Sequence, residues 1–419
     1  MKKEKVSIIG GGIAGIASAI SLIEKGYIVE IFESKKNLGG RAGSISSNDE
    51  FIDIGQHIFL DSYKNFIYIL EKLNVMDKIK VNQNLNIPII ENNKKFHIKS
   101  NFKIFPFSIL FAILGYKNIN LTNRFRVIYG LIKLRLLKHN ENEEEKVINW
   151  LYRNNQNNET ITKFWSIICK PAFNQDLEKI STLHFSNLFQ TMIFKPKKNI
   201  SICYWIEPFT KIIQNQFLGF IEKNNSKVFL GENIKEIKKV NNEIILISND
   251  KKHKTKNLIV ATSLENALNF TNKKISEIKY NKSAIINIYY WFDHKIMSDD
   301  FIAFTNSDLQ WVFSENIENK NIQKIVISLS DAEKLLKVKN EILMNSFEKK
   351  LRNEMQINKN VKVIKSKVIR SPKATQNINK IKLDTNKKIH FVGDWTISEM
   401  PNTLESAAMS GINLIKDKF

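Results

Sequence analysis

The alternation of apolar and polar residues at the two ends of the chain predicts strands and helices in turn. Near the N-terminus, the apolar run Val6–Ile9 predicts a buried strand, an alanine-rich helix follows, and Tyr27–Phe32 predicts a second strand. Near the C-terminus, Ile389–Thr396 predicts a strand that runs into a Gly-Asp turn, and a helix begins near Asn402 or Thr403. Strands that alternate with helices indicate an α/β fold with a doubly wound parallel sheet.

The middle of the chain follows other patterns. Residues 86–200 are richer in helix-like periodicity, whereas Ser226–Thr262 has the alternation of several strands joined by polar turns. Ala284–Phe292 and Lys324–Ser330 predict further strands, and a helix is expected between Asp331 and Gln356. The middle of the chain is therefore expected to mix helices with strands.

These patterns divide the chain into two interleaved units. A chain of 419 residues is expected to form two domains. One domain is expected from residues 1–85, 205–272 and 366–419, and a second, mixed α+β domain is expected from residues 86–204 and 273–365. The two ends of the chain then meet in one domain, and the second domain is inserted into it.

A glycine-rich turn follows the first predicted strand. Gly10, Gly12 and Gly15 stand at G-x-G-x-x-G spacing, and Glu33 ends the second strand. The first glycine allows a tight turn, the second lets the backbone approach a pyrophosphate, and the third lets helix and strand pack closely. The start of the helix offers unpaired N–H groups to the phosphates, and the acid accepts from a ribose. This order predicts dinucleotide binding, with further candidate contacts at Ile13, Ala14, Ser34 and Ile234.

A second glycine cluster lies just beyond Glu33. Leu-Gly-Gly-Arg at residues 38–41 places Gly40 where the backbone can lie flat against a cofactor, and Arg41 where a fixed positive charge can meet phosphate. The apolar run Phe51–Phe59 is then broken at Gly55. Gln56 and His57 are expected beside the cofactor at that break.

The C-terminal strand, turn and helix form a third candidate segment. Asp394, next to Gly393, is expected to accept hydrogen bonds from cofactor hydroxyls or an N–H group. The amides near Thr403 and Leu404 are expected to point the positive end of a helix dipole at a ring carbonyl.

Taken together, the three segments resemble the flavoprotein group of amine oxidases, phytoene desaturases and GDP-dissociation inhibitors. The resemblance implies FAD rather than NAD, and an α/β fold in which a Rossmann-like FAD-binding domain of the amine-oxidase type carries an inserted mixed α+β substrate domain. Within the group, the chain is most similar to hydroxysqualene dehydroxylases of hopanoid synthesis. The stretches that carry this likeness are residues 39–44, 52–57, 308–315 and 393–411, with a weaker one at 164–174. The chain departs from that family's pattern at Ile54, at Ser406 and at Tyr204–Phe209.

The reaction implied by this resemblance is reductive removal of an allylic hydroxyl from hydroxysqualene, which yields squalene and water. Hydroxide is a poor leaving group, so a proton donor assists its departure. His57 is the candidate catalytic acid, and a structural role for its side chain is the alternative. The rival activities are carotenoid desaturation or isomerisation, amine oxidation, and a non-catalytic prenyl-binding role of the GDP-dissociation-inhibitor type. The electron donor is left open.

Composition narrows the possible partners. The formal net charge of +22 fits either lysine-rich solvated surface or attraction to an anionic membrane, and the spread of basic residues gives no nucleic-acid recognition motif. Two cysteines and seven scattered histidines indicate neither a disulfide framework nor a metal site. Because neither a signal peptide nor a spanning segment is evident, a cytoplasmic protein, peripheral on the inner face of the cytoplasmic membrane, is expected.

Two apolar stretches suit an isoprenoid substrate drawn from a bilayer. Ile104–Leu114 is apolar on most faces but too short to span, and Asn123–His139 mixes apolar with basic residues as an interfacial helix does. The alternative is that both are core helices of the second domain. An apolar tunnel is expected, with these candidate aromatic walls, each of which could instead be core: Trp165, Phe173, Trp205, Tyr289, Tyr290 and Trp311.

Overall fold

The fold was analysed in a computed structural model of the chain. The structure describes residues 4–47, 50–56, 58–82, 85–102, 104–137, 145–194, 201–249, 251–271, 273, 278, 280–317, 321–378, 383 and 388–419.

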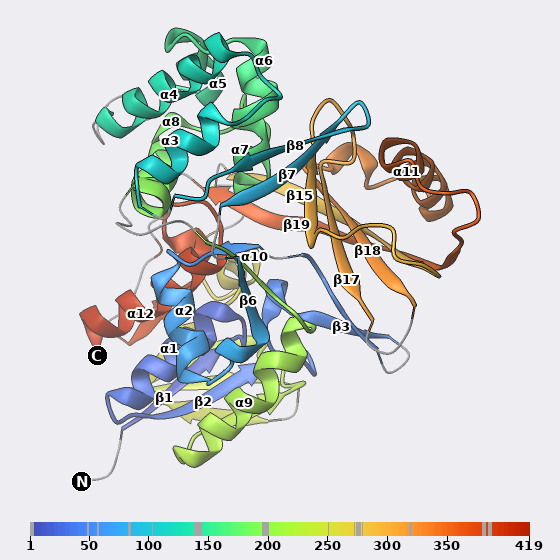
Figure 1. Cartoon of the computed structure of the whole chain (residues 1–419). Coiled ribbons are helices and arrows are strands. Elements are labelled where there is room, and N and C mark those ends of the chain that lie inside the picture. Colours follow the sequence, from blue (N-terminus) through green and yellow to red (C-terminus); the bar gives the residue numbers. More distant parts are fainter. Residues whose placement is uncertain are drawn as a thin grey trace.

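A five-stranded parallel sheet unites both ends of the chain with a central segment (Figure 1). Its strand order is β10-β2-β1-β14-β20, and neighbouring strands pair in parallel. These strands span Lys5–Ile9 (β1), Ile28–Glu33 (β2), Lys227–Leu230 (β10), Asn257–Val260 (β14) and Ile389–Phe391 (β20). The expected doubly wound sheet is therefore confirmed, with the C-terminal strand at one edge.

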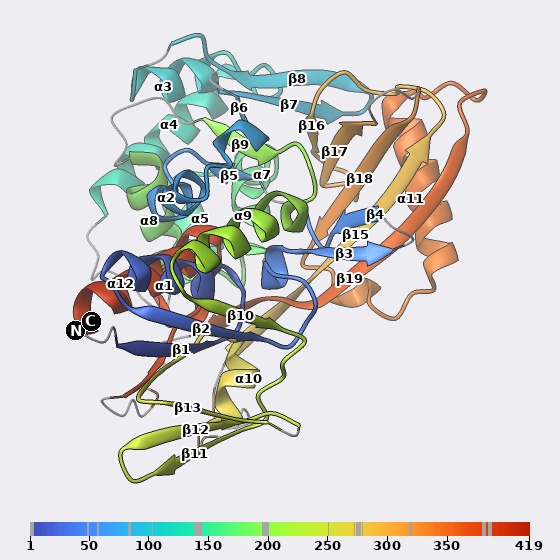
Figure 2. The ribbon, with the colours of Figure 1, turned by 90° about the horizontal axis from the view of Figure 1, so that it is seen from below.

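Helices cover one face of this sheet and a small sheet covers the other (Figure 2). Helices α1 (Ile13–Glu24) and α9 (Phe209–Lys223) lie against the strands, and α12 (Leu404–Lys418) and α2 (Lys64–Lys72) pack on α1. The small sheet is an antiparallel meander of β11 (Glu236–Val240), β12 (Glu243–Ile247) and β13 (Lys252–Thr255), and the short helix α10 (Leu264–Leu268) follows β14. The strands expected within Ser226–Thr262 are thus present, but they belong to two different sheets.

Close packing of α1 on α12 joins the two chain ends. A Cβ atom at Gly411 in α12 would lie 2.6 Å from the Ala14 carbonyl oxygen of α1. Only a residue without a side chain permits the two helices to approach this closely.

A seven-stranded sheet forms the second layer of the molecule, on the right in Figure 1. Its order is β19-β15-β18-β17-β16-β7-β8. The strands span Asn86–Glu91 (β7), Lys94–Lys99 (β8), Tyr280–Phe292 (β15), Phe301–Phe304 (β16), Trp311–Asn316 (β17), Gln323–Ser330 (β18) and Val363–Ile378 (β19). Helix α11 (Asn340–Met355) packs on this sheet through Leu343, Phe347 and Leu351.

Two segments of this sheet differ from the sequence-based expectation. Residues 86–99 form a hairpin rather than helix, because β7 pairs with β8 on one side and with β16 on the other. Strand β19 pairs with β15 over most of its length, although residues 366–378 were expected with the nucleotide-binding unit. The long strand therefore runs from the second sheet back to the edge of the first.

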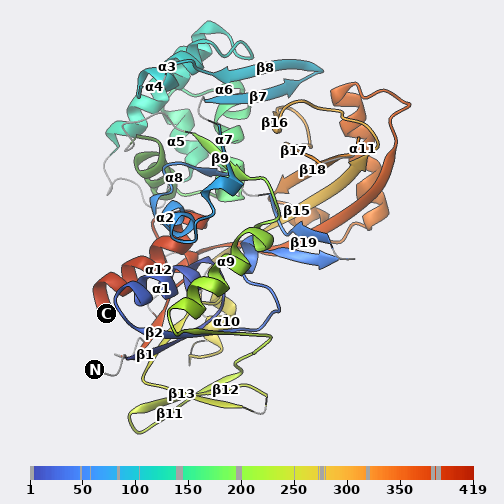
Figure 3. The same cartoon turned by 60° about the horizontal axis from the view of Figure 1, so that its bottom comes forward.

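The remaining helices form a separate cluster at the top of Figure 1, and Figure 3 gives a tilted view of it. They are α3 (Phe107–Leu114), α4 (Leu121–Leu136), α5 (Val147–Arg153), α6 (Asn158–Thr160), α7 (Ser166–Phe173) and α8 (Thr182–Leu188), with π-helical turns at Ile161–Trp165 and Phe189–Phe194. Short strands also lie outside the sheets described above: β3 (Ser44–Ser47) pairs with β4 (Glu50–Asp53), and β9 (Ile202–Trp205) pairs with β5 (Phe59–Leu60) and β6 (Ile79–Asn82). Among the described residues, no helix has the length and apolarity needed to cross a bilayer.

The buried carboxylate of Asp53 joins several of these pieces. It accepts from Ser44 Oγ (2.6 Å), Trp205 Nε1 (2.7 Å) and the Phe209 amide (2.9 Å), and its own carbonyl oxygen accepts from the Tyr289 hydroxyl (2.6 Å). Burial raises the pKa of this carboxyl above its usual value, and the three hydrogen bonds to it act in the opposite direction. Asp53 thus links the β3–β4 hairpin, β9 and α9 through its side chain, and the second sheet through its backbone carbonyl.

Candidate active site

The first and third glycines of the N-terminal turn are required by sterics. Gly10 has φ of +107°, and a Cβ there would lie 2.4 Å from the Ala261 carbonyl oxygen. A Cβ at Gly15 would lie 2.0 Å from the Gly10 carbonyl oxygen. Helix α1 therefore starts directly against the end of β1, and Gly12 caps it without a side-chain hydrogen bond or an acidic residue in the first turn. Such a helix start can receive a phosphate.

Glu33 lies beside this turn at the carboxyl end of β2. Its side chain is buried, and it accepts from the Gly11 amide (2.7 Å), the Lys35 amide (2.9 Å) and the Ser34 hydroxyl (3.2 Å). A carboxylate has about four acceptor positions, so these three bonds leave capacity for a ribose hydroxyl. The acid both braces the glycine turn and borders the cavity described below.

The second glycine cluster packs against the first. The Gly39 amide donates to the Gly11 carbonyl (2.9 Å), and a Cβ at Gly40 would lie 3.1 Å from the Gly12 Cα. Gly12 and Gly40 both line the cavity. Two stretches of bare backbone therefore face the same space, as a flat cofactor would require.

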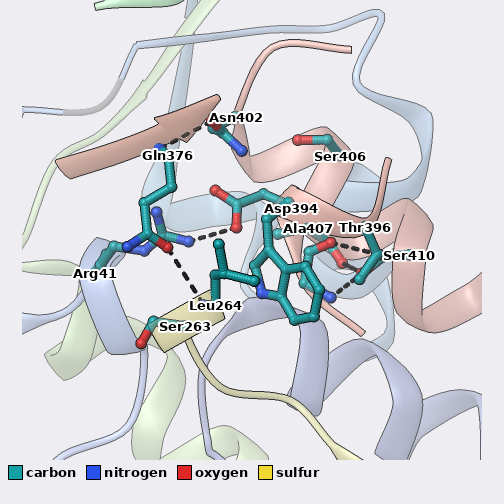
Figure 4. Close-up of polar contacts among 12 residues, drawn as sticks. Arg41, Ser263, Leu264, Gln376, Asp394, Thr396, Asn402, Ser406, Ala407 and Ser410 are labelled. Atoms are coloured by element: carbon teal, nitrogen blue, oxygen red, sulfur yellow. Dashed lines mark hydrogen bonds and ion pairs between the residues drawn. The ribbon is translucent and has the colours of Figure 1, made fainter. Parts of the chain in front are cut away.

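Arg41 connects this cluster to the C-terminal segment (Figure 4). Its guanidinium forms an ion pair with Asp394 and donates to the Ala374 carbonyl (2.9 Å). The Asp394 side chain is nearly buried, whereas that of Arg41 remains 42% exposed. The pair holds the N-terminal and C-terminal cofactor motifs at one position, with cationic surface still available to an anionic ligand.

The start of α12 is organised by a capping box rather than by free amides. The Thr403 amide donates to Ser406 Oγ (2.8 Å), and the Ser406 amide donates to Thr403 Oγ1 (3.2 Å). Ser406 accepts from the Thr403 amide, and the expectation that the amides near Thr403 and Leu404 point at a ring carbonyl stays a prediction. Ser406, a departure from the family pattern, is what completes the cap. Behind it, the Gly393 amide donates to Ser410 Oγ (3.0 Å; Figure 4).

A cavity of about 1500 Å³ runs from the glycine turn into the second layer. Of the predicted site residues, those that line it are Gly10, Gly12, Ile13, Ala14, Glu33, Ser34, Gly40, Arg41, Gly55, Gln56, Ile234, Gly393, Asp394, Thr403 and Leu404. Gly15 lies behind the turn and acts through packing alone. His57 lies outside the described residues, between the lining residues Gln56 and Ile58.

Basic side chains outnumber acidic ones around the described part of this cavity. The acidic residues that line it are Glu33, Glu232 and Asp394, and the basic ones are Lys35, Arg41, Lys235, Lys367, Arg370 and Lys373. Excess positive charge in a concave site favours an anionic ligand such as a dinucleotide pyrophosphate.

The far end of the cavity is largely apolar and was mostly missed by the sequence analysis. Its walls come from α7, the turn after α8, β9 and the inner face of the seven-stranded sheet, through Ile167, Ile168, Pro171, Ala172, Leu188, Ile193, Ile202, Ile285, Trp311 and Phe313. Trp311 and Phe313 stand two apart on β17, and Ser328 and Ser330 do the same on β18. Period-two alternation was the available signal, but it does not say which face of a strand meets a cavity.

Of the six aromatic residues considered as tunnel walls, Trp311 alone lines the cavity. The others are buried core residues: Trp165, Phe173, Trp205, Tyr289 and Tyr290. Trp205 donates to Asp53, and Tyr289 donates to the carbonyl of the same residue, so both fix the fold around the site.

Comparison with known proteins assigns the family. The pattern described as "Flavin containing amine oxidoreductase" matches residues 13–334, more than half of the chain. The chain belongs to the flavin-containing amine oxidoreductase family. The cofactor that goes with this family is FAD. The backbone cradle at Gly12 and Gly40, the buried acid Glu33 and the positive cavity fit FAD as the bound group.

Carotenoid desaturases are among the relatives of this flavin-containing chain. A zeta-carotene desaturase from Synechocystis is 21% identical over 248 residues, which cover 56% of this chain and 50% of that protein. A 15-cis-phytoene desaturase from Synechococcus elongatus is 21% identical over 97% of this chain and 94% of its own length. The chain therefore spans about half the length of the zeta-carotene desaturase that it matches.

Solved structures agree on the fold. An oxidoreductase from Methanosarcina mazei superimposes with a TM-score of 0.74 at 15% identity, over 98% of this chain and 100% of its own. The expected FAD-binding domain with a substrate domain is therefore confirmed.

Proposed function

We propose that this flavin-containing oxidoreductase acts on a long isoprenoid. The observation that carries the proposal is the continuity of one cavity, from the glycine turn and Arg41 into the apolar walls around Leu188, Ile193 and Trp311. A polyprene offers few polar groups to bind, so burial of apolar surface must supply most of its affinity. Gly12, Gly40 and Glu33 would hold FAD at the glycine end, which leaves the apolar end for the substrate.

The proposed reaction is reductive dehydroxylation of hydroxysqualene. The allylic carbon–oxygen bond breaks, the departing hydroxide takes up a proton as water, and the carbon gains a hydride. Bound reduced FAD supplies that hydride and is itself oxidised. The chain supplies a dry wall and a fixed orientation, and both matter because water would quench an allylic cation. The stretches that suggest this substrate include residues 308–315, whose Trp311 and Phe313 line the apolar end.

A proton donor is needed near the apolar end. The described residues that line this end include no carboxyl or imidazole group. His57 therefore stays the candidate acid, since Gln56 and Ile58 on either side of it border the cavity. The substitution His57→Gln is expected to slow dehydroxylation while the flavin spectrum stays unchanged.

Desaturation of a carotenoid is the second candidate. The specific observation in its favour is the similarity to zeta-carotene and 15-cis-phytoene desaturases. The two reactions run in opposite redox directions, because desaturation removes a hydride and a proton from the isoprenoid and so reduces the flavin.

One pair of incubations separates these reactions. Protein reduced with dithionite is incubated with hydroxysqualene in detergent, and oxidised protein is incubated with phytoene under the same conditions. Squalene detected by mass supports dehydroxylation, and a phytoene product with fewer hydrogens supports desaturation. The purified protein should be yellow and should bleach under dithionite. A folded protein that carries flavin yet converts neither substrate would contradict the proposed isoprenoid activity.

A further inference from the structure

Exposed apolar side chains gather on the helical cluster. Among the residues that the structure describes, nine of the fifteen exposed large apolar side chains lie between positions 102 and 136. They are Phe102, Ile104, Phe107, Phe111, Leu121, Phe125, Tyr129, Ile132 and Leu136. A contiguous apolar surface of this kind marks a contact site rather than ordinary solvated surface.

The spacing on α4 shows that these residues form one face. Leu121, Phe125, Tyr129, Ile132 and Leu136 follow steps of four, four, three and four, which place them on one side of a helix. Val127, Leu131 and Leu134 are buried on the opposite side. Helix α4 therefore has two apolar faces, of which one packs on the protein and one does not.

Helix α3 extends this face because the two helices are tied together. Phe107 and Phe111 on α3 are 52% and 41% exposed. At one end, Arg124 of α4 donates to the Leu114 carbonyl (2.7 Å) at the end of α3; at the other, the Arg135 guanidinium lies 5.4 Å from the Phe105 ring. The helices lie together at the end of the molecule away from β1 and β2 (Figures 1 and 3). We call the exposed residues of α3 and α4 the α3–α4 surface.

The charged residues of the segment that carries the α3–α4 surface are all basic. Residues 104–137 contain no Asp or Glu, but they contain Lys117, Arg124, Arg126, Lys133 and Arg135. Lys117, Lys133 and Arg135 are exposed. An apolar face bordered by basic side chains is complementary to an anionic bilayer, in which the apolar residues enter the acyl boundary and the basic ones meet phosphate.

The α3–α4 surface also contacts the wall of the cavity. Gln190, in the π-helical turn after α8, donates to the Leu134 carbonyl (2.9 Å) and the Arg135 carbonyl (3.0 Å) at the end of α4. Leu188 and Ile193, on either side of Gln190, line the apolar end of the cavity. One turn of chain therefore separates the α3–α4 surface from the space proposed for the isoprenoid.

We propose that the α3–α4 surface docks this protein onto an anionic lipid bilayer, with the turn at Leu188–Ile193 on the route by which an apolar substrate enters. The docking step rests on the exposed face and its charge alone. The entry step rests in addition on the proposed isoprenoid function.

Vesicle flotation of the flavin-loaded full chain tests docking without any substrate, so its result is independent of the proposed function. The probes are phosphatidylcholine vesicles with and without phosphatidylglycerol. The wild-type chain is expected to float with the anionic vesicles, and less so as salt increases. The double substitution Phe125→Ser with Ile132→Ser is expected to reduce vesicle partitioning by about tenfold or more.

Matched controls lie on α11 and β19, outside the helical cluster. Ile342 and Ile364 are 57% and 54% exposed, against 57% and 53% for Phe125 and Ile132. The control pair Ile342→Ser with Ile364→Ser should float as the wild type does. A third variant, Lys133→Gln with Arg135→Gln, should lose its preference for phosphatidylglycerol. The flavin spectrum reports whether each variant is folded.

Three results would overturn docking. The wild-type chain could fail to float with anionic vesicles. The two serine pairs could reduce flotation equally. Lastly, Phe125→Ser with Ile132→Ser could convert a dimer to a monomer in sedimentation and leave flotation unchanged, which would make the α3–α4 surface an interface between two copies of the chain.

Discussion

The substitution Gly15→Ala tests whether contact between α1 and β1 holds the glycine turn in place. A Cβ at this position would lie 2.0 Å from the Gly10 carbonyl oxygen and 3.4 Å from the Ala261 Cβ. The first distance is far inside van der Waals contact and its partner is backbone, so α1 must move away from the turn. Overpacking of this severity costs about 3 kcal/mol. Alanine in a helix offsets about 1 kcal/mol of that cost, for a net loss of about 2 kcal/mol.

Gly219→Ala is the matched control. Gly219 also lies within a helix, α9, but a Cβ there has no other atom within 4 Å. The same substitution should therefore stabilise the protein by about 1 kcal/mol, through helix propensity alone. The two variants differ only in the contact made by one methyl group.

Urea unfolding of both variants, with FAD in excess, measures the difference. The free energies of unfolding should differ by about 3 kcal/mol, with Gly15→Ala the less stable. Equal stability of the two variants would refute the claim that the Gly10–Gly15 contact, rather than sequence spacing alone, defines the turn.

Three further predictions concern other parts of the site. Glu33→Ala removes the acceptor for the Gly11 and Lys35 amides and should raise the FAD dissociation constant, measured by flavin fluorescence, about tenfold. The control is Glu30→Ala on the same strand, whose carboxylate pairs with Lys5; it should leave the FAD dissociation constant unchanged. Asp53→Asn leaves a buried donor without an acceptor and should destabilise the fold by about 1–3 kcal/mol in urea unfolding. Burial raises the pKa of Asp53 in the folded protein above 3.8, the ordinary value of this carboxyl. The stabilisation that comes from this shift is complete below pH 3.8 and is lost as the pH rises through the raised pKa. The loss of stability caused by Asp53→Asn should therefore be larger in acid than at neutral pH. Trp311→Ala enlarges the apolar end of the cavity and should raise KM for an isoprenoid without a change in the flavin spectrum; a changed spectrum with an unchanged KM would contradict the assignment of this end to substrate.

The local motifs could be predicted because each one is a chemical requirement within a short segment. Gly10 and Gly15 follow from sterics that involve residues five apart, and the helix cap at Thr403 depends on Ser406 three residues later. Strands such as β1, β2 and β18 were visible as apolar runs, because buried strands exclude polar side chains. The hairpin at residues 86–99 was missed, since its alternation lies directly before a long helical region.

The partners of these motifs are distant in sequence, and no local pattern encodes them. The pairing of Arg41 with Asp394 joins positions 353 residues apart, and the bonds that the Asn65 and Phe66 amides donate to Glu405 span about as many. The choice of Trp311 over Tyr289 as a cavity wall depends on which face of a sheet turns inward. Period two is the same on both faces.

The sequence by itself determined that this chain binds a dinucleotide at its N-terminal turn and that both chain ends take part, because backbone sterics and helix capping act over a few residues. Only the tertiary structure decided that Arg41 pairs with Asp394, that one cavity extends into the second layer, and that α4 leaves an apolar face uncovered. These outcomes depend on what packs against each element, and packing is set by the whole chain at once.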